Sequence, residues 1–173
     1  YSISKQASSI TQAATTHTMI IIADSGGSKI DWRLIENNGT IGQASGPGFN
    51  PYYQPIEDLQ NSVKELLLPK IHEEVKKIFF YGAGVSSEKN QETIKSAFLE
   101  FFPAAHVEIG WDLLAAARAL CGHEPGIACI MGTGSNSCLY DGEKIIGNVA
   151  NLGWILADEG SGANIGRKFL VDY

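Results

Sequence analysis

The sequence predicts an α/β protein in which a unit of order βββαβαβα is followed by the beginning of a second, similar unit. After an initial run of short apolar segments, segments with strand period alternate with segments of helical period, which favours a mixed sheet. The opening pattern of strand, glycine turn and hairpin returns about a hundred residues later as an internal repeat. With 173 residues, of which 44% are hydrophobic, the chain is long enough to bury a core.

The first three predicted elements form an antiparallel meander. Residues 19–24 are apolar and β-branched, which is typical of a buried strand. A Gly-Gly turn leads to a second strand over 29–36. The stretch "ENNGT" is a hairpin signal, so a third strand is expected over 40–45.

Helices and strands then alternate. The loop "GPGFNPYYQP" ends the third strand, and Pro69 interrupts the helical pattern that follows it. The tract "HEEVKK" (72–77) is interpreted as a solvated helix face. The predicted elements are a helix over 56–68, a strand over 76–84, a helix over 86–102, a strand over 106–110 and a helix over 111–122.

The second unit begins with "GIACIMGTGSNSCLYDGEKIIGNV" (126–149), which has the same strand, glycine turn and hairpin as the first. Both units close on an Ile-Gly pair, Ile41-Gly42 and Ile146-Gly147. A turn and a helix follow in "DEGSGANIGRKFLVDY". We therefore divide the chain into a leader or expression remnant (1–18), a first complete domain (19–123) and the truncated beginning of a second domain (124–173).

Charge and cysteine content exclude several classes of function. The net charge of −6 and the pI of about 5.2, without a basic cluster, argue against nucleic acid and membrane partners. No apolar run reaches the ~20 residues that a membrane span needs. Cys121, Cys129 and Cys138 lack CxxC spacing, so reduced thiols in a cytoplasmic protein are expected.

The two glycine turns are the candidate chemistry. Glycines let backbone N–H groups approach an anion, and adjacent hydroxyl and ammonium groups can donate to phosphate oxygens. A carboxylate beside phosphates, such as Asp24 at the end of the first strand, implies Mg²⁺, held directly or through water. For each turn alone a plain hairpin is an open alternative. The donors are Gly26, Gly27, Ser28 and Lys29 in the first glycine turn and Gly132, Thr133, Gly134 and Ser135 in the second glycine turn.

The motifs together resemble one known family. The stretches "DSGGSK", "GTGSNS", "GPGFNP", "WDLLAAARA" and "NLGWILADEGSGANIGRK" are similar to N-acetylglucosamine kinase and the related BadF/BadG/BcrA/BcrD ATPases of the sugar kinase/Hsp70/actin superfamily. The resemblance implies two RNase H-like (actin-like ATPase) domains around an ATP cleft. It implies transfer of the γ-phosphoryl group of ATP, with Mg²⁺, to a hydroxyl of an N-acetylated amino sugar, with N-acetylglucosamine as the first candidate.

The resemblance also assigns roles. It makes Asp112 the catalytic base, which also contacts the sugar, and it makes Asn50, Asn136 and Asp158 sugar-binding residues. From the residues alone, Asp112 reads as an acid that stabilises a helix start, and Asn50 as a turn former before Pro51. The adenosine-binding segment of the family is absent, so we expect a fragment that phosphorylates sugars poorly by itself.

Two other functions stay open at this point. The first is a BadF-type activator ATPase that drives a partner enzyme and holds an iron–sulfur cluster through cysteines. However, Cys129 and Cys138 are expected in buried strands. The second is a non-catalytic actin-like nucleotide switch. The sugar itself and the oligomeric state, with a homodimer as one possibility, are not determined by the sequence.

Overall fold

The computed structural model describes residues 18–85, 87–149 and 152–173. The predicted leader lies outside them, except for Thr18, which begins the first strand. The first sheet is built from β1 (Thr18–Ser25), β2 (Lys29–Glu36), β3 (Ile41–Pro47), β4 (Glu74–Gly82) and β5 (His106–Trp111). Its helices are α1 (Ile56–Ser62), extended by a π-helical turn (Val63–Leu67) and a 3₁₀ turn (Leu68–Lys70), and α2 (Glu88–Phe101).

The strands of this five-stranded sheet follow the order β3-β2-β1-β4-β5. The β1–β2 and β2–β3 pairs are antiparallel, and the β1–β4 and β4–β5 pairs are parallel. An antiparallel meander followed by parallel strands through helical crossovers was the predicted topology, and it is confirmed.

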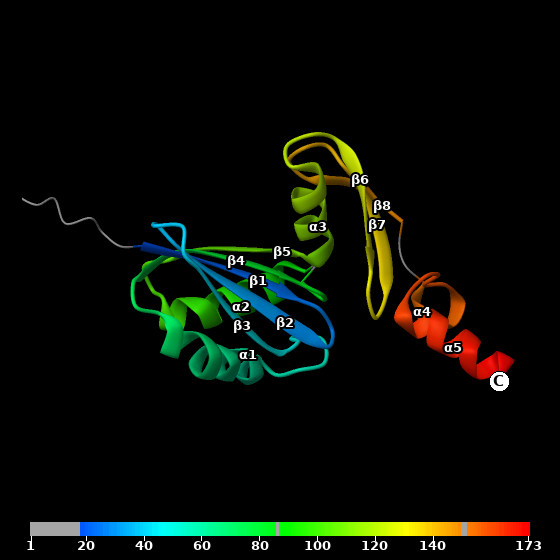
Figure 1. Ribbon diagram of the computed structural model, residues 1–173, viewed down its shortest axis with the longest axis horizontal. Coiled ribbons are helices and arrows are strands. Elements are labelled where there is room, and N and C mark those ends of the chain that lie inside the picture. The colour runs from blue at the N-terminus through cyan, green and yellow to red at the C-terminus, as the bar shows by residue number, and fades with distance from the viewer. Residues whose placement is uncertain (1–17, 86, 150–151) are drawn as a thin grey trace, which may run out of the picture.

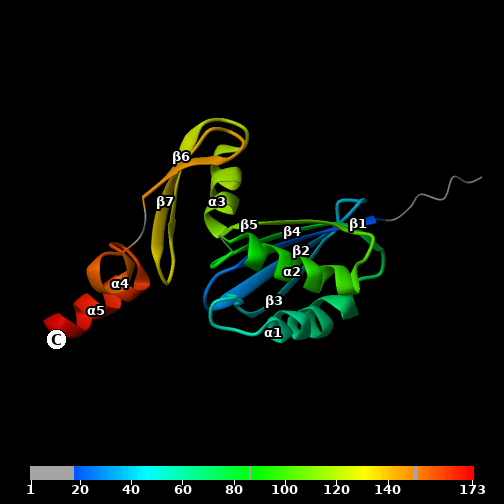
Figure 2. The same cartoon turned by 180° about the vertical axis from the view of Figure 1, so that it is seen from behind.

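One face of this sheet is covered by α1 and α2 (Figure 1 and Figure 2). Alternate residues of β1, namely Met19, Ile21 and Ala23, point to this face and are fully buried. On the helices, Leu59 and Phe98 belong to the same core. The helix α2 begins where Ser87 accepts a hydrogen bond from the Asn90 N–H, as expected for a Ser cap.

The side chains that alternate with these buried residues point to the opposite face of the sheet. Asp24 is the register partner of Tyr81 in β4, and Tyr81 is the partner of Gly110 in β5. Because side chains alternate along a strand, Asp24 points away from the helical core. The unusual carboxylate at the end of β1 therefore stands on the open face of the sheet.

The second sheet repeats the opening meander. It contains β6 (Gly126–Met131), β7 (Ser135–Tyr140) and β8 (Ile145–Asn148) in antiparallel order, and α4 (Gly153–Leu156) and α5 (Gly162–Asp172) follow. The closing glycines are equivalent in detail. A Cβ at Gly42 would lie 3.5 Å from Leu34 Cβ, and one at Gly147 would lie 3.5 Å from Leu139 Cβ. The repeat seen in the sequence is thus a repeat in packing.

The helix α3 (Asp112–Cys121) follows β5 directly, but its apolar face packs on the three-stranded sheet. Leu113 and Ala117 form a second, smaller core with Ala128, Cys138 and Tyr140. Figure 1 and Figure 2 show α3 standing between the two sheets. The domain boundary at residues 123 and 124 stays a prediction, because α3 is continuous with one sheet and packed on the other.

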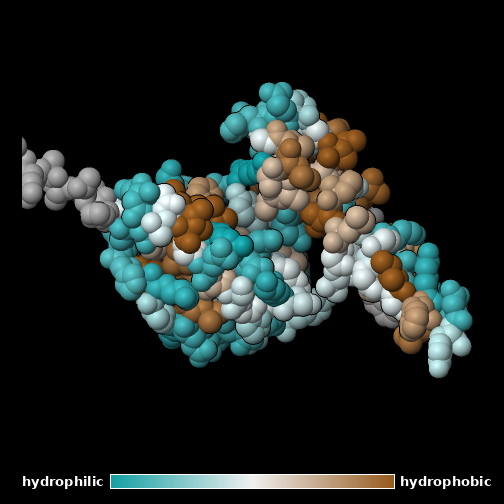
Figure 3. Space-filling view, viewed as in Figure 1, coloured by the Kyte–Doolittle hydropathy of each residue, from teal (hydrophilic) through white to brown (hydrophobic). Residues whose placement is uncertain are grey.

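Two sequence interpretations were wrong. The tract "HEEVKK" is not a helix face, since β4 begins at Glu74 within it. Cys138 is buried as expected, but Cys129 is exposed. Cys129 lies on the outer face of the three-stranded sheet, where Ile127 and Met131 are also exposed and apolar atoms gather over β6 and β7 (Figure 3). In the described part of the chain, no helix is long and apolar enough to cross a membrane.

Candidate active site

A cleft of about 1440 Å³ lies between the two sheets, which is ample for a nucleotide and a second small ligand. Both glycine turns and the start of α3 line it. Of the predicted site residues, only Asp158 does not line it. The residues that do are Asp24, Gly26, Gly27, Ser28, Lys29, Asn50, Asp112, Gly132, Thr133, Gly134, Ser135 and Asn136.

The first glycine turn is tied to the loop after β3. The Gly26 N–H donates to the Lys29 carbonyl at 2.9 Å and closes the turn. Ser25 is fully buried; its Oγ donates to the Phe49 carbonyl at 3.0 Å and accepts from the Phe49 N–H at 2.9 Å. These two bonds hold Asn50, the next residue, beside the turn.

The second glycine turn is held from behind. The Gly132 carbonyl accepts from the Gly162 N–H at the start of α5 at 2.8 Å. The Ser135 N–H and Oγ both donate to Asp158 Oδ1, at 2.6 and 3.1 Å. Asp158 is buried and has a φ of 79°, which is rare for a residue other than glycine. The structure therefore places Asp158 as a support of this turn.

The two turns face each other across the cleft. Ser28 Oγ and Thr133 Oγ1 are 3.5 Å apart. A Cβ at Gly27 or at Gly132 would meet no protein atom within 4 Å, and neither glycine has a positive φ. The backbone conformation does not require glycine at these two positions. Both are explained if an anion approaches the backbone there, so the turns fit the predicted role of phosphate binding.

Lys29 has a partner in the protein itself. Its Nζ lies 2.9 Å from Asp31 Oδ2 at the edge of the cleft. Hydrogen bonds from Ser45 and Lys29 hold the pKa of Asp31 below its usual range. Lys29 would have to exchange this carboxylate for a phosphate in order to act as predicted.

Carboxylates concentrate on the wall near the first turn. Partial burial and the charge of Asp31, its cross-strand neighbour, raise the pKa of Asp24. Burial and the charge of Asp24 also raise the pKa of Asp112, although a hydrogen bond from the Leu113 N–H at 2.8 Å opposes this. A divalent cation would relieve this repulsion, so Asp24 fits the role predicted for Mg²⁺.

A Mg²⁺ ion here would not sit in an all-protein cage. Among the described residues, no group of three or more His, Cys, Asp or Glu side chains could hold a metal ion. Mg²⁺ usually binds one or two carboxylates and takes its other ligands from phosphates and water.

Asn50 and Asn136 line the cleft but already accept hydrogen bonds. Asn50 Oδ1 accepts from the Tyr52 N–H at 3.0 Å, as expected for a turn former. Asn136 Oδ1 accepts from the Ser137 N–H at 2.8 Å and from Asn148 Nδ2 at 2.9 Å. For both side chains the amide NH₂ group is the donor that a sugar hydroxyl could use.

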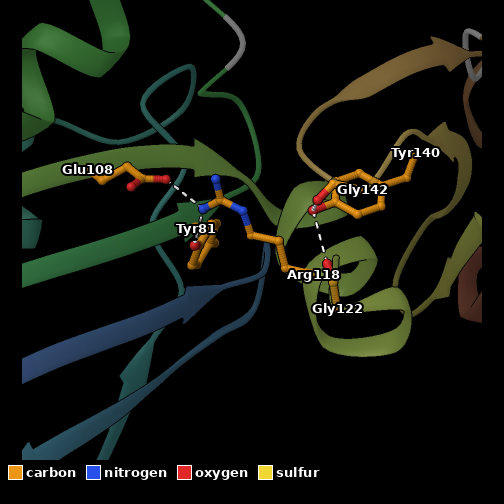
Figure 4. A network of polar contacts seen from close by, with 6 residues as sticks. All are labelled: Tyr81, Glu108, Arg118, Gly122, Tyr140 and Gly142. Carbon is orange, nitrogen blue, oxygen red and sulfur yellow. Dashed lines mark hydrogen bonds and ion pairs between the residues drawn. The ribbon is translucent and has the colours of Figure 1, made fainter. Parts of the chain in front are cut away.

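Sequence reasoning missed three residues of this site. Ser25 looked like part of the turn, and its burial depends on the loop after β3. Tyr81 and Arg118 line the cleft, and Arg118 Nη1 donates to Tyr81 Oη at 2.7 Å (Figure 4). They come from β4 and α3, so no spacing in the sequence could indicate their contact.

Comparisons with known proteins agree with this fold. A solved structure named "putative N-acetylglucosamine kinase" from Porphyromonas gingivalis is 41% identical, with a TM-score of 0.82, over 89% of this chain and 56% of its own. A structure of the same name from Chromobacterium violaceum is 22% identical, with a TM-score of 0.62, over 87% of this chain and 54% of its own. MreB5 of Spiroplasma citri bound to ADP shares the fold, with 11% identity and a TM-score of 0.55, over 76% and 51%. This chain thus spans about half of each neighbour's length. No protein-family model and no curated protein matches the chain.

Proposed function

We propose that this chain belongs with the sugar kinases of the actin-like ATPase fold and forms the sugar and phosphate side of an ATP-dependent kinase for an N-acetylated amino sugar. N-acetylglucosamine is the first candidate, because it is the substrate in the name of the 41% identical structure. One observation carries the proposal. Asp24 and Asp112, both with raised pKa, share a single cleft with both glycine turns.

In this proposal Asp112 is the catalytic base. Its carboxylate accepts the proton of a sugar hydroxyl while that oxygen attacks the γ-phosphorus, and the bond to the β–γ bridging oxygen breaks to release ADP. The raised pKa of Asp112 brings its basicity nearer to neutral pH, where a general base is most effective. Asn50 and Asn136, which line the cleft, hold and orient the sugar. Asp158 acts behind them by holding Ser135, and direct contact of Asp158 with the sugar stays a prediction.

The glycine turns bind the phosphates through backbone N–H groups and through the hydroxyls of Ser28 and Thr133. Ser135 would have to exchange Asp158 for a phosphate in order to donate as predicted. Asp24 holds the Mg²⁺ ion, directly or through water; when bound, the ion neutralises charge on the phosphate oxygens. The iron–sulfur activator is not favoured. Cys138 pairs with Ala128 across the sheet, so the adjacent Cys129 points to the opposite face.

The test is a coupled ADP-release assay on the full-length protein with N-acetylglucosamine, N-acetylmuramic acid, glucosamine and glucose. We expect turnover with an N-acetylated sugar and a loss of 10²–10⁴-fold in Asp112→Asn, as for removal of a general base. Asp58→Asn is the matched control, because Asp58 is an exposed acid in the first turn of α1. If the protein phosphorylated none of the four sugars, or if Asp112→Asn kept near-normal turnover, the proposal would be refuted.

A further inference from the structure

The helix α3 connects the two halves of the cleft without a flexible linker. Trp111 is both the last residue of β5 and the N-cap of α3, so Asp112 lies at the joint itself. Beyond the joint, α3 packs on the three-stranded sheet through Leu113 and Ala117. The angle between α3 and the five-stranded sheet therefore decides how the second glycine turn faces the first.

Arg118 bridges α3 back to the five-stranded sheet. Its Nη1 donates to Glu108 Oε1 in β5 at 2.5 Å and to Tyr81 Oη in β4 at 2.7 Å (Figure 4). Its guanidinium carbon also lies 5.8 Å from the centre of the Tyr81 ring. Six residues after Asp112, Arg118 stands about 9 Å along the helix axis from the joint. A contact at that distance resists rotation of α3 about the joint.

The Tyr81 ring is itself fixed. A Cβ at Gly110 would lie 3.0 Å from Tyr81 Cδ1, so the ring rests directly on the Gly110 backbone. Tyr81 is also the parallel-register partner of Asp24. The ring is thus held between Gly110 and Arg118, next to the carboxylate predicted to hold Mg²⁺.

The other end of α3 is fixed to the three-stranded sheet. Tyr140 Oη in β7 lies 3.2 Å from the carbonyl oxygen of Gly122, which follows α3, and 2.9 Å from that of Gly142 in the β7–β8 turn (Figure 4). With these contacts and the small core, α3 and the three-stranded sheet form one packed body. The bridge from Arg118 acts on that whole body.

We propose that Arg118 is a positioning residue that, through Glu108 and Tyr81, sets the angle of α3 and thereby places Asp112 and the second glycine turn relative to the first. The inference rests on the proposed kinase function. The Arg118–Glu108 ion pair is more than a third exposed on both sides, so it contributes little to folding stability. A misplacement of about 1 Å in an active site nevertheless costs on the order of 10²-fold in rate.

The test compares Arg118→Met, Arg118→Lys and Glu108→Gln with Arg33→Met in the full-length protein. Arg33 is an exposed arginine whose Nη1 donates to the carbonyl of its neighbour Trp32. We expect Arg118→Met to lower kcat by about 10–100-fold, with little change in the KM for sugar and in the melting temperature. Arg118→Lys should retain part of the rate that Arg118→Met loses. Glu108→Gln, introduced together with Arg118→Met, should lower kcat little further. Arg33→Met should behave as wild type.

A second readout does not depend on activity. Spin labels at the exposed turn residues Asn38 and Glu143, in a cysteine-free background, report the distance between the two sheets. We expect Arg118→Met to broaden the distance distribution and Arg33→Met to leave it unchanged. A broadened distribution with normal kcat, or a lowered kcat with an unchanged distribution, overturns the positioning role. If the wild-type protein phosphorylates no sugar, the kinase proposal fails. An unchanged distance distribution in Arg118→Met refutes the positioning role of Arg118, whether or not the protein is a kinase.

Discussion

At the scale of single residues, the site depends on acidic side chains whose burial or backbone conformation is unfavourable for folding. Asp112 begins α3 beside the charge of Asp24, and its pKa is raised mainly by burial. Asp158 is buried and has a positive φ in order to hold Ser135. Such groups persist where the surrounding structure determines their positions, and they cluster at functional sites.

The raised pKa of Asp112 predicts a pH-dependent effect on stability. Because the folded state binds the proton more tightly than the unfolded chain, the stabilising contribution of this group is fully present below its unfolded pKa of about 3.8. That contribution is lost as pH rises through the raised folded pKa. At pH 7 we therefore expect Asp112→Asn to melt a few degrees above wild type, and the difference should shrink as pH falls toward 4.

Calorimetric melting curves between pH 4 and pH 8 measure this effect, with Asp58→Asn as the control. Asp58 is exposed, so its replacement should change the melting temperature equally little at every pH. A lower melting temperature for Asp112→Asn at pH 7 would contradict the assigned environment of Asp112.

At the scale of elements, the two glycine turns do the same work with different supports. The first turn packs against the loop after β3, where a Cβ at Gly48 would lie within 2.7 Å of Lys29 N and closer still to Gly26 O. The second turn is supported by α5 and Asp158. Both arrangements leave one glycine, Gly27 or Gly132, facing open space.

Alanine at Gly27 and at Gly48 should separate ligand binding from folding. Gly27→Ala meets no protein atom, so the melting temperature should stay constant while the KM for ATP rises by roughly tenfold, about 1.4 kcal/mol of binding energy. Gly48→Ala forces two backbone segments apart and should cost about 1–3 kcal/mol of stability. Thermal melts and ATP titrations of both variants give the comparison. Equal effects of the two substitutions on stability would contradict it.

The elements were predictable from the sequence, and their mutual supports were not. Periodicity identified β1 to β3 and the repeated meander, because each strand buries one face. It misplaced the start of β4, where charged residues at Glu74 and Lys76 alternate with a buried Val75. The contacts of Ser25, Arg118 and Asp158 depend on segments far away in the chain. Residue type alone could suggest their chemistry but not their partners.

At the scale of the whole molecule, two cores of unequal size lie on either side of the cleft. The core of the five-stranded sheet contains large fully buried side chains such as Trp32, Phe80 and Phe98, and the rings of Trp32 and Phe80 both pack against Phe98. The core of the three-stranded sheet is built around Leu113, Ala117 and Tyr140, and its outer face exposes apolar residues. Burial is the main source of stability, so the two halves should not be equally stable.

This difference should appear in native-state hydrogen exchange. The amides of β6 to β8 should exchange through openings of lower free energy than those of β1 and β4, because fewer buried contacts oppose their opening. Leu113→Ala should cost about 2–5 kcal/mol, lower protection of β6 to β8 and leave β1 unchanged, whereas Phe98→Ala should lower protection of β1 and β4. Leu120→Ala is the control on the same helix, because Leu120 is 69% exposed and should change neither. If Leu113→Ala lowered protection equally in both sheets, the two cores would unfold as one unit, and α3 would transmit stability as well as position across the cleft.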